Sequence, residues 1–181
     1  MSESLSTSAR LRQLLPELFK ESALTGERYL RYQITPDISA LMAMTHVRES
    51  QLINRDQITP LPQMLPYVMG LCSSREKVFL TIDLPQLLYL PSALVYARRY
   101  HVIVINVADF LPTKNTSELW LGLAVDKIQG ITRISEQNLT IDDSSLTQIE
   151  PKIVTYVEKL QQDKEQILPI LNLQKIISLT N

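Results

Sequence analysis

From residue 28 onward, short apolar runs alternate with turn-forming residues along almost the whole chain. The runs are rich in β-branched and aromatic residues and are separated by Pro, Asn, Asp or Ser, a pattern typical of β-strands. The expected strands cover residues 29–34, 38–44, 67–72, 78–82, 102–107, 119–125, 128–134 and 165–171. This many short strands favours a mainly β fold whose sheets close into barrels.

The first 27 residues have a different, helical pattern, with an N-cap at Ser8. One face of this helix would carry Leu11, Leu14, Leu15, Leu18 and Phe19. Pro16 removes a backbone donor, so we expect a break near Leu15 and a second helical piece that ends near Leu24. Two roles are open: the helix packs on the protein's own surface, or Leu14, Leu18 and Phe19 form a docking surface for another protein.

Composition limits both the fold and the partners. Of the 181 residues, 45% are hydrophobic, enough for one domain or two small packed subdomains. The 18 basic and 19 acidic residues give a net charge of −1, which provides no general attraction to nucleic acid or to an anionic membrane. No apolar run approaches the roughly 20 residues that cross a bilayer, and the first residues do not resemble a secretory signal. We therefore expect a cytoplasmic protein without direct membrane insertion.

The usual motifs of catalysis, metal binding and nucleotide binding do not occur in the sequence. His46 and His101 lie in no metal-ligand spacing, and Asp142 and Asp143 lack the ligand pattern of a calcium loop. The single cysteine, Cys72, excludes an internal disulfide, and its apolar context favours a buried thiol. We expect no catalytic residue, no metal and no cofactor; an enzyme with an unfamiliar site is the less favoured alternative.

A sequence near residue 81 is echoed near residue 170. Residues 81–88 align on residues 170–177 as the end of a strand, an Asx residue (Asp83 or Asn172) and a short apolar helix. Two related barrel-like halves would produce such an echo, although unrelated strand-to-helix junctions also use Asp or Asn.

The stretch from Ile58 to Leu88 combines a proline-paced approach, a polar turn over residues 73–77 and an apolar strand. This order resembles the signature of the CheW family, the adaptors of bacterial chemotaxis, phototaxis and pilus-motility arrays. Gly70 and Arg75 match the glycine before the family's arginine loop and the arginine itself. Departures from the family occur at three positions, where Asn, Leu and Gly are common and this chain has Ser73, Ser74 and Glu76.

Other segments extend the resemblance over residues 28–179. The matching pieces are residues 29–34, 40–44, 47–49, 102–107 and 121–131, the last resembling the family's G-L-x-V-D-x-V-x-G pattern. The resemblance implies two intertwined, five-stranded SH3-like β-barrels with short helices, preceded by residues 1–27 as an N-terminal helical extension. It also favours a strand over residues 151–162, where helical and strand patterns overlap.

The resemblance implies a non-enzymatic adaptor that couples methyl-accepting receptors to a CheA-type histidine kinase and is recruited to receptor arrays at the membrane. The family's arginine contributes to receptor recognition, so Arg75 is the first candidate contact, and its guanidinium suits directed hydrogen bonding. Ser74, Glu76 and Gly70 accompany it in the same loop.

Two further candidates, Val47 and Glu49, match family positions implicated in partner contacts. Structural roles compete with binding roles here, because Val47 could be core, Glu49 a solvated charge and Gly70 a backbone bend. The altered loop also leaves open an antagonist, or a specialised module of this fold without receptor coupling. The long N-terminal helix and the changed loop resemble adaptors of phototaxis and of type IV pili motility.

Overall fold

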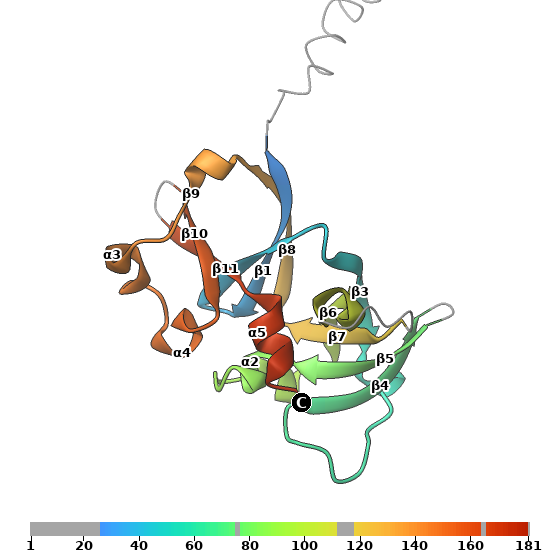
Figure 1. Ribbon diagram of the computed structural model, residues 1–181. Coiled ribbons are helices and arrows are strands. Elements are labelled where there is room, and N and C mark those ends of the chain that lie inside the picture. Colours follow the sequence, from blue (N-terminus) through green and yellow to red (C-terminus); the bar gives the residue numbers. More distant parts are fainter. Residues whose placement is uncertain (1–25, 75–76, 112–117, 164–165, 181) are drawn as a thin grey trace, which may run out of the picture.

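The computed structural model describes residues 26–74, 77–111, 118–163 and 166–180 (Figure 1). The strands are β1 (Glu27–Thr35), β2 (Ile38–Ala43), β3 (Val47–Asn54), β4 (Val68–Ser74), β5 (Lys77–Asp83), β6 (Arg99–Asn106), β7 (Trp120–Val125), β8 (Lys127–Ile134), β9 (Leu139–Thr140), β10 (Val157–Asp163) and β11 (Gln166–Leu171). The helices are α2 (Leu84–Leu87), α3 (Asp143–Leu146), α4 (Pro151–Val154) and α5 (Leu173–Ser178), with short 3₁₀ turns η1 (Arg55–Gln57), η2 (Ala93–Tyr96), η3 (Val107–Phe110) and η4 (Glu136–Asn138).

The prediction of a mainly β fold with short helices is confirmed, and all eight expected strands are present. Two strands were not expected. In β3 only Ile53 is buried, so an apolar run that would reveal the strand is missing, and β9 has just two residues. The expected N-terminal helix, with Leu14, Leu18 and Phe19, lies outside the described residues. The division into residues 1–27 and 28–179 stays a prediction.

The strand expected over residues 151–162 is wrong in its first part, which forms α4 before β10 begins at Val157. Pro151 stands at the first helical position, where its fixed φ suits a helix and its missing N–H costs nothing. Ile153 is completely buried on this short turn. The helical spacing of apolar residues therefore correctly indicated the structure at the start of the segment, and the strand propensity correctly indicated the structure at its end.

The strands form two sheets with the same internal order. The first sheet runs β8-β1-β2-β11-β10-β9 and the second runs β3-β6-β7-β5-β4. Each contains one parallel pair, β2 with β11 and β5 with β7, at corresponding positions. The first sheet has six strands rather than the expected five, because β9 adds to its edge. We call the curled first and second sheets the first and second barrel.

The second barrel is formed by one continuous segment that is inserted into the first. The chain leaves the first barrel after β2 and enters the second as β3, and it leaves the second after β7 to enter the first as β8. The turns η1 and η4 follow β3 and β8, the first strand after each crossing, and α2 and α5 follow the parallel strands β5 and β11. The internal echo in the sequence thus extends to the topology of the whole chain.

Alternating residues place both faces of the central strands in apolar surroundings. On β6, Tyr100, Val102 and Val104 point into the second barrel, whereas Ile103 and Ile105 belong to a larger core shared by both sheets. A third cluster, which includes Tyr29, Leu41 and Leu168 from three strands of the first sheet, fills the first barrel. Figure 1 shows α5 and α2 in the region between the sheets, where their apolar residues join the shared core.

Each parallel strand ends in an Asx-capped helix. Asp83 accepts a hydrogen bond from the N–H of Gln86 at 2.9 Å, and Asn172 accepts one from the N–H of Lys175 at 3.0 Å. Equivalent tyrosine carbonyls accept from the two caps themselves, Tyr67 from the Asp83 N–H and Tyr156 from the Asn172 N–H. The sequence echo between residues 81–88 and 170–177 therefore corresponds to one repeated local structure.

Candidate partner-binding site

One end of the second barrel gathers polar side chains from four strands. The hydroxyl of Ser74 on β4 donates to Oε1 of Glu49 on β3 at 2.7 Å. The Nζ of Lys77 on β5 lies 3.7 Å from the centroid of the Trp120 ring on β7. Because β3 and β4 are the two outer strands of their sheet, the Ser74–Glu49 bond joins its edges and shows that the sheet curls around on itself.

The arginine loop belongs to this end. Ser74 pairs with Lys77 as the last pair of the β4–β5 hairpin, so Arg75 and Glu76 connect the two strands and lie outside the described residues. The prediction of a polar turn over residues 73–77 is wrong at its margins, because both strands continue to Ser74 and Lys77. Ser73 stays exposed on the outer face while Cys72 points inward, so the polar residues fit the alternation of a strand.

Gly70 lies toward the middle of β4, where the backbone approaches a neighbouring segment closely. Its φ is +137°, and a Cβ at this position would lie 2.2 Å from the carbonyl oxygen of Thr59. Thr59 and Leu71 exchange two backbone hydrogen bonds of 2.8 and 2.9 Å. The structure thus gives Gly70 a clear structural reason, the backbone bend and close approach weighed from the sequence.

Val47 begins β3 opposite Ile105, and the pairing shifts between Val47 and Glu49. Its side chain is half-buried and packs against the shared core, whereas Glu49 points to the barrel end. The structure therefore brings together Ser74 and Glu49 among the candidate contacts, with the ends of the arginine loop beside them. Val47 packs against the shared core instead, and Gly70 is four positions before Ser74 on β4.

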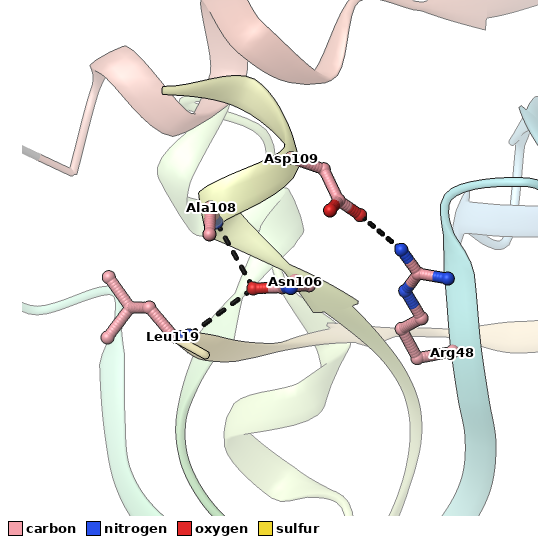
Figure 2. Close-up of polar contacts among 5 residues, drawn as sticks. All are labelled: Arg48, Asn106, Ala108, Asp109 and Leu119. Atoms are coloured by element: carbon pink, nitrogen blue, oxygen red, sulfur yellow. Dashed lines mark hydrogen bonds and ion pairs between the residues drawn. The ribbon is translucent and has the colours of Figure 1, made fainter. Parts of the chain in front are cut away.

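A second set of contacts, not predicted from the sequence, lies beside this end (Figure 2). Oδ1 of Asn106 accepts hydrogen bonds from the N–H of Ala108 at 3.1 Å and of Leu119 at 3.3 Å. Arg48 and Asp109 form an ion pair of 2.6 Å that links β3 to η3. Asn106 thereby holds both ends of the connection between β6 and β7. Residues 112–117 of this connection lie outside the described part. The sequence signal that could have indicated these contacts is an Asn at the end of an apolar strand, where its side chain can accept from nearby backbone N–H groups.

The electrostatics of the site favour recognition rather than chemistry. Arg48 and Asp109 keep substantial exposure, so their ion pair contributes little stability and is open to solvent. The contact of Lys77 with the Trp120 face is worth on the order of 0.5–1 kcal/mol at such a position. These side chains offer a mixed set of charges and donors around an aromatic ring, which suits a weak protein contact.

Groups with potential chemistry elsewhere have structural roles. Cys72 is buried, as expected, and burial raises the pKa of its thiol, which suppresses the reactive thiolate. Asp142 caps α3, and hydrogen bonds from Ser144 and Ser145 hold the pKa of its carboxyl below the usual value. His46 contacts the ring of Phe110 at 4.9 Å between centroids. Over the described ranges, no three His, Cys, Asp or Glu side chains are grouped as a metal site.

Substitution of Ser74 by alanine is expected to lower the free energy of unfolding by about 0.5–1.5 kcal/mol, because the half-buried Glu49 carboxylate loses its donor. Urea denaturation measures this change. Ser73→Ala is the matched control, since Ser73 is exposed on the opposite face. Equal stability of the two variants would contradict a closing role for the Ser74–Glu49 bond.

Comparisons with known proteins agree with this architecture. The family model described as the CheW-like domain matches residues 37–181. Among solved structures, the scaffolding protein TtCheW from Thermoanaerobacter tengcongensis superposes with a TM-score of 0.63 at 14% sequence identity, over 81% of this chain and 89% of that chain. At this identity the superposition establishes the similarity of fold. No curated protein matches the chain in sequence.

Proposed function

Since the chain belongs to the CheW-like domain family, we propose that it couples methyl-accepting receptors to a CheA-type histidine kinase as a non-enzymatic adaptor. The observation that carries this proposal is the match of the CheW-like domain model over residues 37–181, and the chemotaxis adaptors of that family support it. The fold supports it, because two curled sheets packed on one shared core offer separate surfaces to two partners. Each contact can be weak, since many copies in an array reinforce one another.

We assign receptor recognition to the end of the second barrel that carries Ser74, Glu49 and the arginine loop. Arg75 would extend from a hairpin whose last described pair, Ser74 and Lys77, is held on both sides by contacts with β3 and β7. Such support reduces the entropy that a recognition loop loses on binding. Glu76 stands beside Arg75 and adds a charge for which a receptor surface would need a complementary cation.

The proposal is tested by reconstituting the protein with the CheA-like kinase and a receptor signalling domain of its own organism and measuring kinase autophosphorylation. Wild type should make the activity depend on the receptor. Arg75→Glu should still bind kinase but reduce this receptor dependence about tenfold or more, because charge reversal removes a directed contact and adds repulsion. Arg133→Glu, an exposed charge reversal on β8, should behave like wild type. Binding of neither partner by wild type would refute the adaptor function.

A specialised module without receptor coupling is the second candidate, and the Ser74–Glu49 bond favours it. Ser74 stands where the family commonly has Leu, and its hydroxyl engages a carboxylate that is itself a candidate contact. A receptor donor would therefore have to compete with the Ser74 hydroxyl for the Glu49 carboxylate. The same reconstitution separates the two functions, because the specialised module would bind kinase while leaving its activity independent of receptor.

The proposed location is the cytoplasm, with recruitment to membrane receptor arrays through the receptor itself. Throughout the described part of the chain, no helix has the length and apolarity needed to cross a bilayer. Whether the pathway serves chemotaxis, phototaxis or type IV pili motility is determined by the receptor and the response regulator, and the adaptor role proposed here applies to each.

A further inference from the structure

One pair of corresponding ends of the two barrels has the same local structure. In the second barrel, Ile53 on β3 pairs with Tyr100 on β6. In the first barrel, Ile134 on β8 pairs with Glu27 on β1. Both isoleucines are buried, and a 3₁₀ turn, η1 or η4, begins two residues after each of them. We call these equivalent regions the η1 end of the second barrel and the η4 end of the first barrel.

The η1 end is basic. Arg55, Arg98 and Arg99 border an open cavity of about 520 Å³ together with Asp56. The three arginine residues are exposed, and within the described ranges none of them forms an ion pair. This end therefore presents three positive charges and one negative charge to solvent.

The η4 end is acidic. Glu27 and Glu158 border a cavity of about 440 Å³, and Glu27 and Glu136 border one of about 320 Å³. Burial raises the pKa of the Tyr29 phenol, and the three glutamate charges raise it further, so they act at one place. Lys159 offsets one of them, since its Nζ lies 3.8 Å from Oε1 of Glu136. This end therefore presents three negative charges and one positive charge.

The basic residues nearest to the η4 end along β1 and β8 do not change its sign. Arg28 and Arg133 stand opposite each other in the pairing of these strands. Each lies one position from a residue that points into the barrel, Tyr29 or Ile134. Because successive side chains of a strand alternate, both arginines belong to the outer face of the sheet and not to the mouth of the barrel.

We propose that the η1 end of one molecule binds the η4 end of a second copy of this chain. Charge complementarity identifies the occupant, because the two ends have the same construction and opposite signs. The chain as a whole carries a net charge of −1, so two copies do not repel each other strongly. Val95 and Tyr96 are exposed beside the basic end, where Arg55 donates to the Val95 carbonyl oxygen at 3.1 Å, and they add apolar area to the contact.

This contact joins two different surfaces, so it is head-to-tail. Each pair of molecules keeps one free end of each sign, and further copies can add until a ring closes or an open chain forms. Because the charges are exposed, the contact is weak and sensitive to salt. The proposal is independent of the adaptor function, since it involves neither the arginine loop nor the Ser74–Glu49 bond and its test contains no kinase or receptor.

Sedimentation velocity of the purified full chain tests the proposal. Wild type should associate in about 0.02 M salt, where charges act over about 20 Å, and should be monomeric in about 0.5 M salt, where they act over about 4 Å. Arg98→Glu with Arg99→Glu should raise the dissociation constant about tenfold or more, and so should Glu136→Arg with Glu158→Arg. A wild type that is monomeric at low salt, or association that persists at high salt, would overturn the proposal.

A control and a mixture separate this contact from a general effect of charge. Asp37→Arg with Asp143→Arg changes the net charge as much as the glutamate reversal, at exposed carboxylates elsewhere, and should associate as wild type does. The arginine reversal leaves both ends acidic, and the glutamate reversal leaves both ends basic. An equal mixture of these two variants should therefore associate at low salt although neither does alone, which would also show that both are folded. A mixture that stays monomeric, or a control that loses association, would refute the contact.

Discussion

Replacement of Gly70 by alanine is expected to destabilise the protein by about 3 kcal/mol or more. The new methyl group would lie 2.2 Å from the Thr59 carbonyl oxygen and 2.7 Å from its carbon, both backbone atoms that two hydrogen bonds hold in place. Relief would require the Thr59–Leu71 bridge to open, and with it the contact between β4 and the segment after β3. Chemical denaturation monitored by the fluorescence of Trp120, the only tryptophan, would measure the loss.

Gly130 provides a matched control for this prediction. Its φ of +135° nearly equals that of Gly70, so alanine meets the same backbone strain, yet no atom lies within 4 Å of the added Cβ. Gly130→Ala should therefore cost only about 1 kcal/mol. Similar losses for the two variants would mean that strain alone, and not the close approach to Thr59, sets the requirement for glycine at residue 70.

This comparison also bears on Gly70 as a candidate contact. A Gly70 variant that loses partner binding would do so through a distorted β4, whose last residue, Ser74, leads into the arginine loop. Binding measurements on such a variant need a stability measurement beside them. Arg75 substitutions, made between strands that the change leaves intact, separate recognition from folding more cleanly.

The second large effect is expected at Asp83. Asp83→Ala should cost about 2–3 kcal/mol, because the N–H of Gln86 and the Ser92 hydroxyl both lose an acceptor, in two part-buried hydrogen bonds. Asp83→Asn should stay within about 1 kcal/mol of wild type near neutral pH, since an amide oxygen still accepts from the Gln86 N–H. The chain itself provides the precedent, because Asn172 caps α5 in this way. Urea titrations of the three proteins measure the differences.

The pH dependence of the same variants has a defined sign. Burial raises the pKa of the Asp83 carboxyl above its usual value of 3.8, against the opposing hydrogen bonds from Ser92 and Gln86. The folded state therefore takes up a proton first as the pH falls, and the contribution of Asp83 to stability increases from neutral pH down toward 3.8. Wild type should gain stability relative to Asp83→Asn over this window. A constant difference between the two proteins would show that the carboxyl pKa is not raised.

Much of the β architecture could be predicted because alternating burial leaves a readable pattern in strands such as β6, whose inner residues are all apolar. The strand β3 could not, because most of its side chains are exposed or half-buried at the edge of the sheet and its pairing is specified by β6 rather than by its own sequence. The helix α4 was missed for a related reason. One turn of helix has too few residues for periodicity to outweigh strand propensity, and Pro151 was the decisive local signal.

The residues of the candidate site could be predicted only where they belong to a motif of the family. The family resemblance pointed to Ser74 and Glu49 separately, but their hydrogen bond depends on the curvature of the sheet, which brings together residues 25 positions apart. The contacts of Asn106 and Arg48 with the excursion after β6 depend in the same way on the register of β3 against β6. Register between distant strands is a property of the assembled core and leaves little trace in a single sequence.

The insertion of the second barrel between β2 and β8 splits the first barrel along the chain. A fragment that ends after β7 would keep only β1 and β2 of the first barrel, and one that begins at β8 would hold that strand without its neighbour β1. Neither fragment contains a complete first barrel, although two complementary fragments could assemble into the whole. For a protein placed between partners, this arrangement has a mechanical consequence, because two chain connections and a shared apolar core join the barrels and oppose their separation or free rotation.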